Sequence, residues 1–562
     1  MVTVIKRDGS EVSYDLERIS TAIAGAFEDV GKKEFDDLYI LDSIEQMIKD
    51  SNKDKVSVED IQDMVEIALM ESGYVDEAKA YILYRYEHEL ARRKRQEKAV
   101  EEKLLASNVQ NQNANIDENS FGGRKGEADN VVMKQFALDN LVSKMARDNH
   151  LNNEIYIHDL DSYAVGMHNC LSIPFDDLLA NGFNTRQTDV RPANSVNTAM
   201  QLVAVIFQLQ SLQQFGGVSA THLDWTMVPY VRKSFYKHFK DGLKYLGPEH
   251  MHSKSIEKYL NECNDNMSIE DEIYKAGGPI YNYAIDMTER EVHQAVEGMY
   301  HNLNTLQSRS GNQLPFTSIN YGTCTLPEGR MVTKALLEVS IEGLGKLHKT
   351  SIFPCGIFQC MKNVNRKPGD PNYDLFQLAL KSTAQRLYPN YANVDWSNNA
   401  GYDINDPRTY FSTMGCRTSN GFDINGFGQL KDGRGNICPV TIIMPTLAMK
   451  ANRDVEKFMS LLDKKIFEAK DMLIERFEWI CSQDPKSASF MYENGTMYGY
   501  VPEEGIRSAL KHGTIVIGQL GLAETLQLLV GCDHTEEKGM ELAKRIENYL
   551  KIGALNLKKN IN

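Results

Sequence analysis

The pattern of apolar and polar positions at the N-terminus predicts a β-hairpin followed by a helix. Residues 2–14 hold two short β-prone runs separated by Asp8-Gly9, a pair that favours a tight hairpin turn. Apolar residues then recur at the spacing of one helix face, at Leu16, Ile19, Ile23 and Phe27. We therefore expect a small domain that opens with a hairpin.

A later helix in this domain carries start and stop signals. Ser57 and Asp60 have the spacing of a capping box, and Gly73 supplies the stop. The inward positions that the spacing predicts are Ile61, Val65 and Leu69. Another helical pattern over 78–86 runs into the highly charged residues 87–98, which we interpret as a solvated helix end or linker.

An Asn- and Gln-rich stretch, residues 107–119, marks the domain boundary. We expect a small domain over 1–95, a linker over 96–119 and a large domain over 120–562. In the large domain, long helical patterns alternate with short apolar runs, at 319–321, 351–358 and 440–444. This alternation predicts a mostly parallel sheet or barrel wrapped by helices.

Composition and charge narrow the class of protein. The 562 residues are 42% hydrophobic and 25% charged, without an apolar run long enough to cross a bilayer or form a signal peptide, so we expect a soluble, cytoplasmic protein. A net charge of −15 disfavours nucleic acid and anionic membranes as partners, although a small phosphorylated ligand stays open. Nine cysteines without a CxxC pair indicate reduced thiols and no zinc site in this chain.

Three motifs occur in order in the N-terminal domain, VIKRDG at 4–9, DLERI at 15–19 and AKAYILYR at 78–85. Together they resemble the ATP-cone, the regulatory module of ribonucleotide reductases. The resemblance implies ATP and dATP as allosteric effectors. We expect their phosphates at the hairpin and the first helical turn, where cations reach phosphate oxygens, and the residues proposed are Lys6, Arg7, Asp8, Gly9 and Arg18.

Several separated segments carry the second resemblance: Tyr156-Ile-His-Asp159, His168-Asn-Cys170, Gln214-Phe-Gly-Gly217, residues 302–322, Thr413-Met-Gly-Cys-Arg417, Gly433-Arg-Gly-Asn436 and residues 512–518. From about residue 110 to the last residues, the chain resembles the anaerobic, class III, glycyl-radical type of ribonucleotide reductase. The resemblance implies an α/β fold, a ten-stranded α/β barrel of the glycyl-radical enzyme type. A small, mainly helical ATP-cone with a β-hairpin lid precedes it.

The resemblance also implies a reaction, the reduction of ribonucleoside triphosphates to 2′-deoxyribonucleoside triphosphates. Cys416 matches the position that becomes a thiyl radical and removes the ribose 3′ hydrogen. Cys170 matches the thiol on the opposite ribose face, and formate is the expected reductant. Asn436 matches the amide that hydrogen-bonds in the pocket, where it can donate and accept without burying a charge.

The resemblance also implies binding partners. It implies a homodimer or higher oligomer, a dNTP specificity effector, and a separate iron–sulfur activating enzyme that uses S-adenosylmethionine. Family members continue into a C-terminal segment with zinc-binding CxxC pairs and the radical glycine, and this sequence stops at Asn562 before them. Three explanations stay open: the sequence is a truncation, the product of an interrupted gene, or one half of a split enzyme whose glycyl-radical half is a separate polypeptide. The alternative is a catalytically incomplete nucleotide-binding fragment or subunit of a split reductase.

Two other classes that share a module with this chain are excluded by their cysteine patterns. Oxygen-dependent reductases use a Cys-x-Glu pair, and no cysteine here has Glu two positions later. Pyruvate formate-lyase and its relatives use adjacent cysteines, and the sequence contains no Cys-Cys.

The remaining candidates have simpler interpretations. Cys438 follows Asn436 by two, so an extended segment would bring a second thiol to the pocket, whereas a bulge at Pro439 would turn it away; we favour formate and an inert Cys438. Cys324 stands where family members usually carry an acid. His168 has two possible roles: it is buried against backbone carbonyls, or it takes part directly in the reaction. Small buried side chains are expected at Cys263, Cys355, Cys360, Cys481 and Cys532.

Overall fold

The computed structural model describes residues 3–5, 11–32, 38–51, 55–104, 121–309, 313–396, 399–415 and 418–560. The predicted N-terminal hairpin is present, since β1 (Thr3–Ile5) pairs antiparallel with β2 (Glu11–Ser13). A third strand, β3 (Lys55–Ser57), lies parallel to β1 on its other edge. No local pattern indicated β3, because its partner is distant in the sequence.

Four helices complete the N-terminal domain: α1 (Leu16–Asp29), α2 (Leu38–Asp50), α3 (Val58–Glu71) and α4 (Val75–Leu104). The capping box of α3 is present, because the Ser57 hydroxyl accepts from the Asp60 amide at 3.0 Å and the Asp60 carboxylate accepts from the Ser57 amide at 3.3 Å. Gly73 follows α3 with φ of +82°, as a stop position requires. The predicted inward residues Ile23, Phe27 and Leu69 are buried.

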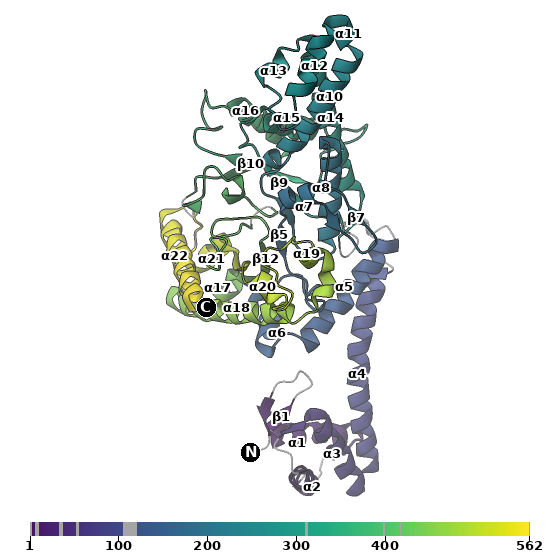
Figure 1. Ribbon diagram of the computed structural model, residues 1–562. Helices are drawn as coiled ribbons and strands as arrows, with labels where there is room; N and C mark the ends of the chain where they lie inside the picture. The colour runs from purple at the N-terminus through teal and green to yellow at the C-terminus, as the bar shows by residue number, and fades with distance from the viewer. Residues whose placement is uncertain are drawn as a thin grey trace.

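Helix α4 crosses the expected domain boundary. It continues to Leu104, so the linker expected over 96–119 begins as helix. Figure 1 shows α4 rising from the small domain along the side of the large one, where it packs against α5 (Phe121–Asn140). The charged stretch therefore continues a helix that joins the two domains.

The large domain is built on an eight-stranded sheet with the order β11-β10-β9-β8-β5-β12-β13, and β4 pairs with β12 beside this path. The strands are β4 (Ile155–Ile157), β5 (Cys170–Ser172), β8 (Val218–Ala220), β9 (Thr317–Tyr321), β10 (Cys355–Cys360), β11 (Asn390–Asn393), β12 (Gly435–Ile443) and β13 (Thr514–Leu520). The α/β class and the preceding small domain are as expected. The described residues contain eight of the ten strands that the resemblance implied.

The sheet consists of two parallel groups joined antiparallel. Strands β5, β8, β9, β10 and β11 run parallel to one another, and β12 runs parallel to β13. The groups meet where β12 pairs antiparallel with β5 and, further along, with β4. Because β12 is the longest of these strands, it has room for both partners on one edge. The predicted mostly parallel sheet is thus confirmed, with one antiparallel junction.

Helices cover each group of strands and form two cores. The helices α8 (Val196–Ser211), α10 (Val228–Tyr245), α14 (Pro279–Thr305) and α15 (Pro327–Glu342) pack around the β8–β10 side. The helices α17 (Met444–Ala451), α18 (Val455–Cys481), α21 (Leu522–Val530) and α22 (Glu537–Asn560) pack around β12 and β13. In Figure 1, α10 and α14 extend upward beyond the sheet together with three short helices, α11 (Gly247–His250), α12 (Ser253–Glu262) and α13 (Glu272–Lys275).

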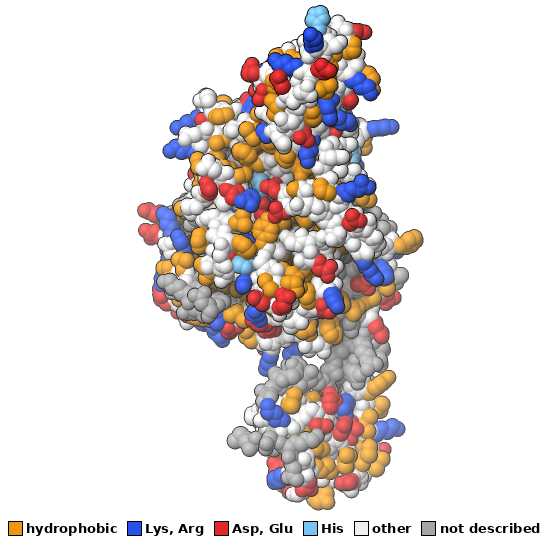
Figure 2. Space-filling model, viewed as in Figure 1, with side chains coloured by type: hydrophobic (Ala, Val, Ile, Leu, Met, Phe, Trp, Pro, Cys, Tyr) orange, Lys and Arg blue, Asp and Glu red, His pale blue; other side chains and the backbone are white. Residues whose placement is uncertain are grey.

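The other helices and strands of the large domain are α6 (Lys144–Leu151), α7 (Phe175–Asn181), β6 (Phe183–Asn184), β7 (Asp189–Val190), α9 (Leu223–Thr226), α16 (Tyr373–Arg386), α19 (Ser489–Glu493) and α20 (Arg507–Leu510). Charged side chains of both signs are interspersed over the face shown in Figure 2. Among the described helices, none combines the length and apolar character needed to span a bilayer.

Candidate active site

Cys170 and Asn436 lie opposite each other at the junction of the two strand groups. They are direct partners in the antiparallel pairing of β5 and β12, and both side chains are buried. The backbone amide of Gly217 donates to the Cys170 Sγ atom at 3.2 Å, and the Asn169 side-chain amide donates to the Asn436 Oδ1 atom at 3.2 Å. Two candidates from separate motifs are thereby brought into one site.

Glycines in two motifs allow this close approach. A Cβ atom on Gly435 would lie 2.0 Å from the Cys170 carbonyl oxygen, so only glycine lets β12 reach β5 here. A Cβ atom on Gly216 would lie 2.1 Å from the Asn169 Oδ1 atom. The glycines of Gln214-Phe-Gly-Gly217 and Gly433-Arg-Gly-Asn436 therefore serve packing around Cys170 and Asn169.

The described segment that ends at Gly415 reaches the same place, whereas the next two residues, Cys416 and Arg417, lie outside the described residues. The end of this segment is held by Asn320, whose side chain accepts from the Thr413 amide and donates to the Thr413 carbonyl, both at 3.0 Å. The Gly415 amide donates to the Ser318 hydroxyl at 3.0 Å. On the other flank, the side chain of Thr418 hydrogen-bonds to the Cys170 thiol. The described neighbours of Cys416 thus contact β9 and Cys170.

The electrostatics of the site keep the Cys170 thiol neutral. Burial raises the pKa of Cys170 to about 11, although the Gly217 amide and the Thr418 hydroxyl favour the thiolate. Arg309, from the motif at 302–322, binds the Phe215 carbonyl and the Gln313 side chain, and burial lowers its pKa. A neutral thiol retains the hydrogen atom that a reductant must give up.

Asn436 has both side-chain N–H donors unpaired among the described residues. Its Nδ2 atom is buried and has no acceptor among the described residues. A buried amide donor without a partner is costly, so the site is suited to a ligand oxygen at this position. Formate or a ribose hydroxyl fits that requirement, since both present oxygen acceptors.

Comparison with known proteins agrees with these motifs. The sequence model of the anaerobic ribonucleoside-triphosphate reductase family matches residues 112–561, and that of the ATP cone domain matches residues 2–90. The chain belongs to the anaerobic ribonucleoside-triphosphate reductase family. Its N-terminal domain belongs to the ATP-cone class of nucleotide-effector domains.

Individual relatives cover nearly the whole chain. The anaerobic ribonucleoside-triphosphate reductase of Haemophilus influenzae is 29% identical over 564 residues, which span 98% of this chain and 74% of that protein. The reductase of Salmonella typhimurium is 30% identical over 97% of this chain and 72% of its own length. The crystal structure of the anaerobic ribonucleotide reductase from Thermotoga maritima with dATP and CTP shares the fold, with a TM-score of 0.53 and 15% identity over 78% of this chain and 67% of that chain.

Three residues that were not among the sequence candidates contact the candidate site. Asn169 binds Asn436, and the Gln214 side chain donates to the carbonyls of Gly217 at 2.7 Å and Asn169 at 3.1 Å. Arg309 is the third residue at the site that was not a sequence candidate. All three lie within the motifs that carried the resemblance, so their position in those motifs was the available signal.

His168 is buried, which agrees with the first of the two roles considered for it. Its Nε2 atom contacts the Met491 sulfur at 2.8 Å, not a backbone carbonyl, and its Nδ1 atom has no hydrogen-bond partner among the described residues. Burial lowers the pKa of His168 to about 4, so the ring is neutral at physiological pH.

The Cys438 side chain points away from the candidate site. The register of β12 against β13 shifts between Asn436 and Cys438, so the period of two does not place both side chains on one face. The Cys438 thiol is buried against α18, where it donates to the Leu473 carbonyl over 3.6 Å. The same-face hypothesis is therefore wrong, and the bulge explains why.

A carboxylate is present near Cys324 even though Cys324 replaces the usual acid. Asp224 accepts from the backbone amides of Cys324 at 2.9 Å and Gly322 at 2.8 Å.

Elsewhere, Cys263, Cys355 and Cys532 are buried as expected, whereas Cys360 and Cys481 are partly exposed. The expectation of a fully buried side chain is wrong for those two.

The effector residues proposed in the cone lie mostly outside the described part of the chain. Lys6, Arg7, Asp8 and Gly9 are not described. Arg18 is described on the first turn of α1, where it is 74% exposed and forms an ion pair with Asp15 at 3.2 Å. Within the described residues, no cluster of His, Cys, Asp or Glu is suited to a metal ion.

Proposed function

We propose that this chain reduces ribonucleoside triphosphates to 2′-deoxyribonucleoside triphosphates by thiyl-radical chemistry. The observation that carries the proposal is the pairing of Cys170 with Asn436 beside the flanks of the loop that holds Cys416. Cys416 acts as the radical thiol, Cys170 as the thiol on the opposite ribose face, and Asn436 as the hydrogen-bonding amide.

Formate is the proposed reductant. The overall change oxidises formate to carbon dioxide, replaces the 2′-hydroxyl by hydrogen and releases water, with one proton consumed. Cys170 contributes as a neutral hydrogen-atom donor, which its raised pKa supports. The unpaired Asn436 Nδ2 donor supports an oxygen ligand in the same place. Burial excludes water that would quench a radical intermediate.

Regulation and assembly complete the proposal. Residues 1–95 form the regulatory unit and bind ATP and dATP through Lys6, Arg7, Asp8, Gly9 and Arg18, and a dNTP acts at a second, specificity site. The working enzyme is a cytoplasmic dimer or larger oligomer. Generation of the radical requires an iron–sulfur activating enzyme with S-adenosylmethionine and a glycyl-radical segment that binds zinc, supplied if necessary as a separate polypeptide.

An anoxic reconstitution tests the chemistry. The chain, the activating enzyme, S-adenosylmethionine, a glycyl-radical polypeptide and formate are combined, and deoxynucleotide formation is measured for the wild type, Cys416→Ala and Cys170→Ala. Both substitutions should abolish turnover and leave nucleotide binding unchanged, because they remove a sulfur atom and little volume. Turnover above background in Cys416→Ala would show that another residue is the radical thiol.

The same assay separates the enzyme from a binding subunit. Formate-dependent product from the wild type supports the reductase. Nucleotide binding to the wild type without any product, under conditions where a full-length relative is active, would support a regulatory subunit that no longer turns over substrate.

A further inference from the structure

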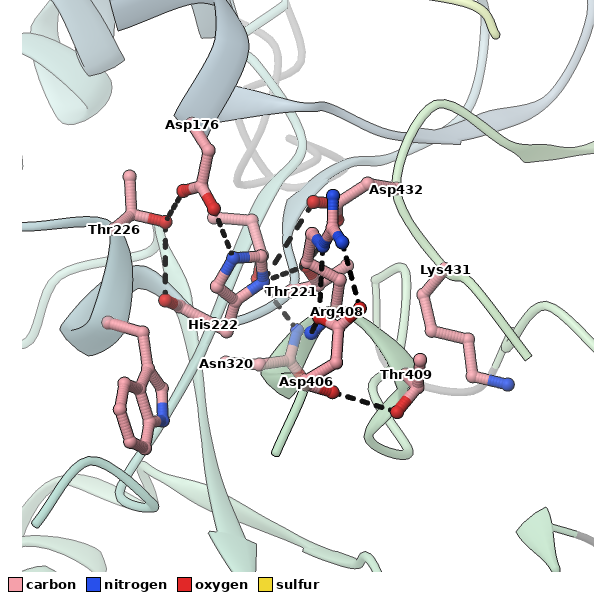
Figure 3. Close-up of polar contacts among 12 residues, drawn as sticks. Asp176, Thr221, His222, Thr226, Asn320, Asp406, Arg408, Thr409, Lys431 and Asp432 are labelled. Atoms are coloured by element: carbon pink, nitrogen blue, oxygen red, sulfur yellow. Dashed lines mark hydrogen bonds and ion pairs between the residues drawn. The ribbon is translucent and has the colours of Figure 1, made fainter. Parts of the chain in front are cut away.

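A chain of polar contacts lies next to the active site, at the carboxyl ends of β5 and β8 (Figure 3). The Asp176 carboxylate binds the His222 Nε2 atom at 3.0 Å and accepts from the Thr226 hydroxyl at 2.6 Å. The His222 Nδ1 atom binds the Thr221 hydroxyl at 2.6 Å, and that hydroxyl donates to the Asp432 carboxylate. The chain links α7, the loop after β8 and the turn before β12.

With Asp432 ionised, the hydrogen-bond directions make His222 doubly protonated. The single hydrogen of the Thr221 hydroxyl goes to Asp432, so its oxygen accepts from His222 Nδ1–H, while His222 Nε2–H donates to Asp176. His222 and Asp432 are almost completely buried. A cation buried between two carboxylates is the arrangement in which each charge offsets the burial of the others.

The charges around the ring agree with this assignment. Burial alone would lower the pKa of His222, but Asp176, Asp432 and Asp224 outweigh it and raise the pKa to about 9. Burial raises the pKa of Asp432 to about 7, and His222 opposes that shift with help from Arg408. Of these two cations, His222 has the larger effect on Asp432, and Arg408 itself forms a bidentate pair with Asp406.

The turn that begins at Asp432 leads directly into the catalytic pairing. The Gly433 amide donates to the Ser172 carbonyl at 2.8 Å, and the Ser172 amide donates to the Arg434 carbonyl at 3.0 Å. The next pairs along these strands are Gly435 with Leu171 and Asn436 with Cys170. A displacement of Asp432 therefore passes along a continuous ladder to the Asn436 amide.

We propose that His222 is a positioning residue whose charge, acting through Thr221 and Asp432, holds the 432–434 turn in the register that sets Asn436 opposite Cys170. The catalytic consequence rests on the proposed function, whereas the structural consequence does not. If His222 only filled space, the effect of replacing it would not depend on the charge of Asp432. If its charge holds the turn, removing the charge of Asp432 should offset the loss of His222.

Three variants and one control test this role. His222→Gln removes the cation and leaves two facing carboxylates, and Asp432→Asn removes one of the two negative charges. The double variant His222→Gln/Asp432→Asn relieves the repulsion between the two carboxylates. His238→Gln is the matched control, since His238 binds Glu291 at 2.7 Å in the helical region of α10 and α14.

Hydrogen exchange on the chain alone measures the register without requiring turnover. In His222→Gln, the peptides that contain Ser172 and Gly433 should exchange at least about tenfold faster, which corresponds to roughly 1.4 kcal/mol of lost protection. The double variant should recover most of the protection, and His238→Gln should match the wild type in these peptides. Unchanged exchange in His222→Gln, or no recovery in the double variant, would overturn the proposal.

The reconstituted reductase gives the second measurement. A misplacement of about 1 Å costs roughly 100-fold in rate, so His222→Gln should lower kcat to that extent and change the KM for the ribonucleotide by less than about threefold. The double variant should regain at least about tenfold of this loss. A wild type without turnover would contradict the proposed function, while the exchange result would still decide the role of His222.

If His222→Gln fails to fold, the wild type and Asp432→Asn keep the question decidable. In the chain labelled at histidine carbons, NMR should show the His222 ring as an imidazolium at pH 7.5. The Asp432→Asn change should lower its pKa, because one of the carboxylates that stabilise the cation is gone. A neutral ring in the wild type at pH 7.5 would overturn the proposal.

Discussion

At the scale of single residues, hydrogen-bond partners distinguish the two buried thiols of Cys170 and Cys438. Cys170 and Cys438 are both buried, and burial raises the pKa of Cys170 to about 11 and that of Cys438 to about 12. Cys170 contacts the Gly217 amide and pairs with Asn436, whereas Cys438 contacts only the Leu473 carbonyl of α18 among the described hydrogen bonds. The surroundings, not the ionisation of the sulfur, separate the two.

Cys438→Ser tests this distinction. Turnover of the reconstituted enzyme should remain dependent on formate and stay within about threefold of the wild type, because the thiol lies against α18. Product formation is measured with and without formate in both forms. Formate-independent turnover that the substitution abolishes would assign Cys438 to reduction by a disulfide.

The pH dependence of stability follows from His222. Its pKa is about 9 in the folded chain and about 6.5 when unfolded, so its contribution is complete below pH 6.5 and is lost as the pH rises through 9. The pKa of Asp432 is raised from 3.8 to about 7, so the stability associated with Asp432 is lost between about pH 4 and 7. Between pH 7 and 9, His222 therefore contributes and Asp432 does not, while Lys431, whose pKa burial lowers to about 8, also titrates in this window.

The expected result is a fall in unfolding free energy, on the order of 1–3 kcal/mol from pH 7 to 9, in the wild type relative to the double variant His222→Gln/Asp432→Asn. The double variant has no titratable group at either position. Subtracting its unfolding free energy from that of the wild type removes the contributions of the groups that the two proteins share. Urea titrations at several pH values provide the measurement. A flat or rising difference over this window would argue against a charged His222.

At the scale of elements, glycine positions determine how closely the strands approach. The period of two along β12 does not predict the bulge before Cys438 or the contact of Gly435 with the Cys170 carbonyl. The bulge belongs to the pairing with β13 and the glycine contact to the pairing with β5, and both partner strands are distant in the sequence. The motif Gly433-Arg-Gly-Asn436 was visible in the sequence, but the reason for its glycines was not.

Gly435→Ala should disrupt this approach. The new methyl group meets the Cys170 carbonyl oxygen at 2.0 Å, and overpacking of this kind costs about 1–3 kcal/mol. The urea midpoint should fall and turnover should drop. Gly421→Ala is the control, because no atom lies within 4 Å of its Cβ position and the midpoint should not change. Equal midpoints for the two variants would contradict the packing argument.

In the cone, the last residue of the third motif joins two helices. Arg85 on α4 binds three acids of α3, with contacts of 2.5 Å to Glu59, 2.7 Å to Asp63 and 2.9 Å to Glu66. The guanidinium is mostly buried and its neighbours are partly exposed, so the pairs act as a small network and not as isolated surface bridges.

Arg85→Ala should lower the stability of the cone by roughly 1 kcal/mol. Hydrogen exchange in α3 should accelerate, while exchange in β5 and β12 stays the same. Arg290→Ala serves as the control, since Arg290 makes one exposed pair with Asp286 on α14. Loss of protection in β12 on Arg85→Ala would mean that the effect is not local to the cone.

At the scale of the whole molecule, α4 joins the effector domain to the reductase domain (Figure 1). A continuous helix transmits position better than a flexible linker, so occupancy of the cone has a direct structural route to α5. The charged composition of 87–98 had suggested a helix end or linker, and the structure extends the helix through it.

ATP and dATP should compete for the cone, and Lys6→Ala should weaken both. One lost charge-assisted phosphate contact costs roughly 1.5–3 kcal/mol, or about 10- to 150-fold in affinity. Calorimetry on the full chain provides the measurement, with Lys49→Ala as a control because Lys49 is exposed on α2 and pairs with Glu45. Unchanged binding in Lys6→Ala would remove Lys6 from the effector site.

The sequence by itself determined the features that depend on neighbouring residues or on family motifs. The hairpin of β1 and β2, the capping box at Ser57 and the buried face of α3 follow from local periodicity and capping. The family, the α/β class and the candidates Cys170 and Asn436 follow from motifs whose order is preserved along the chain.

Only the tertiary structure decided what depends on contacts between distant segments. The antiparallel junction of β5 with β12, the bulge that directs Cys438 to α18 and the Asp176–His222–Asp432 network join segments that lie dozens to hundreds of residues apart. Periodicity describes which face of one element is buried, but not which element covers it. The network also needs burial, since its charges stabilise one another strongly only where water is excluded.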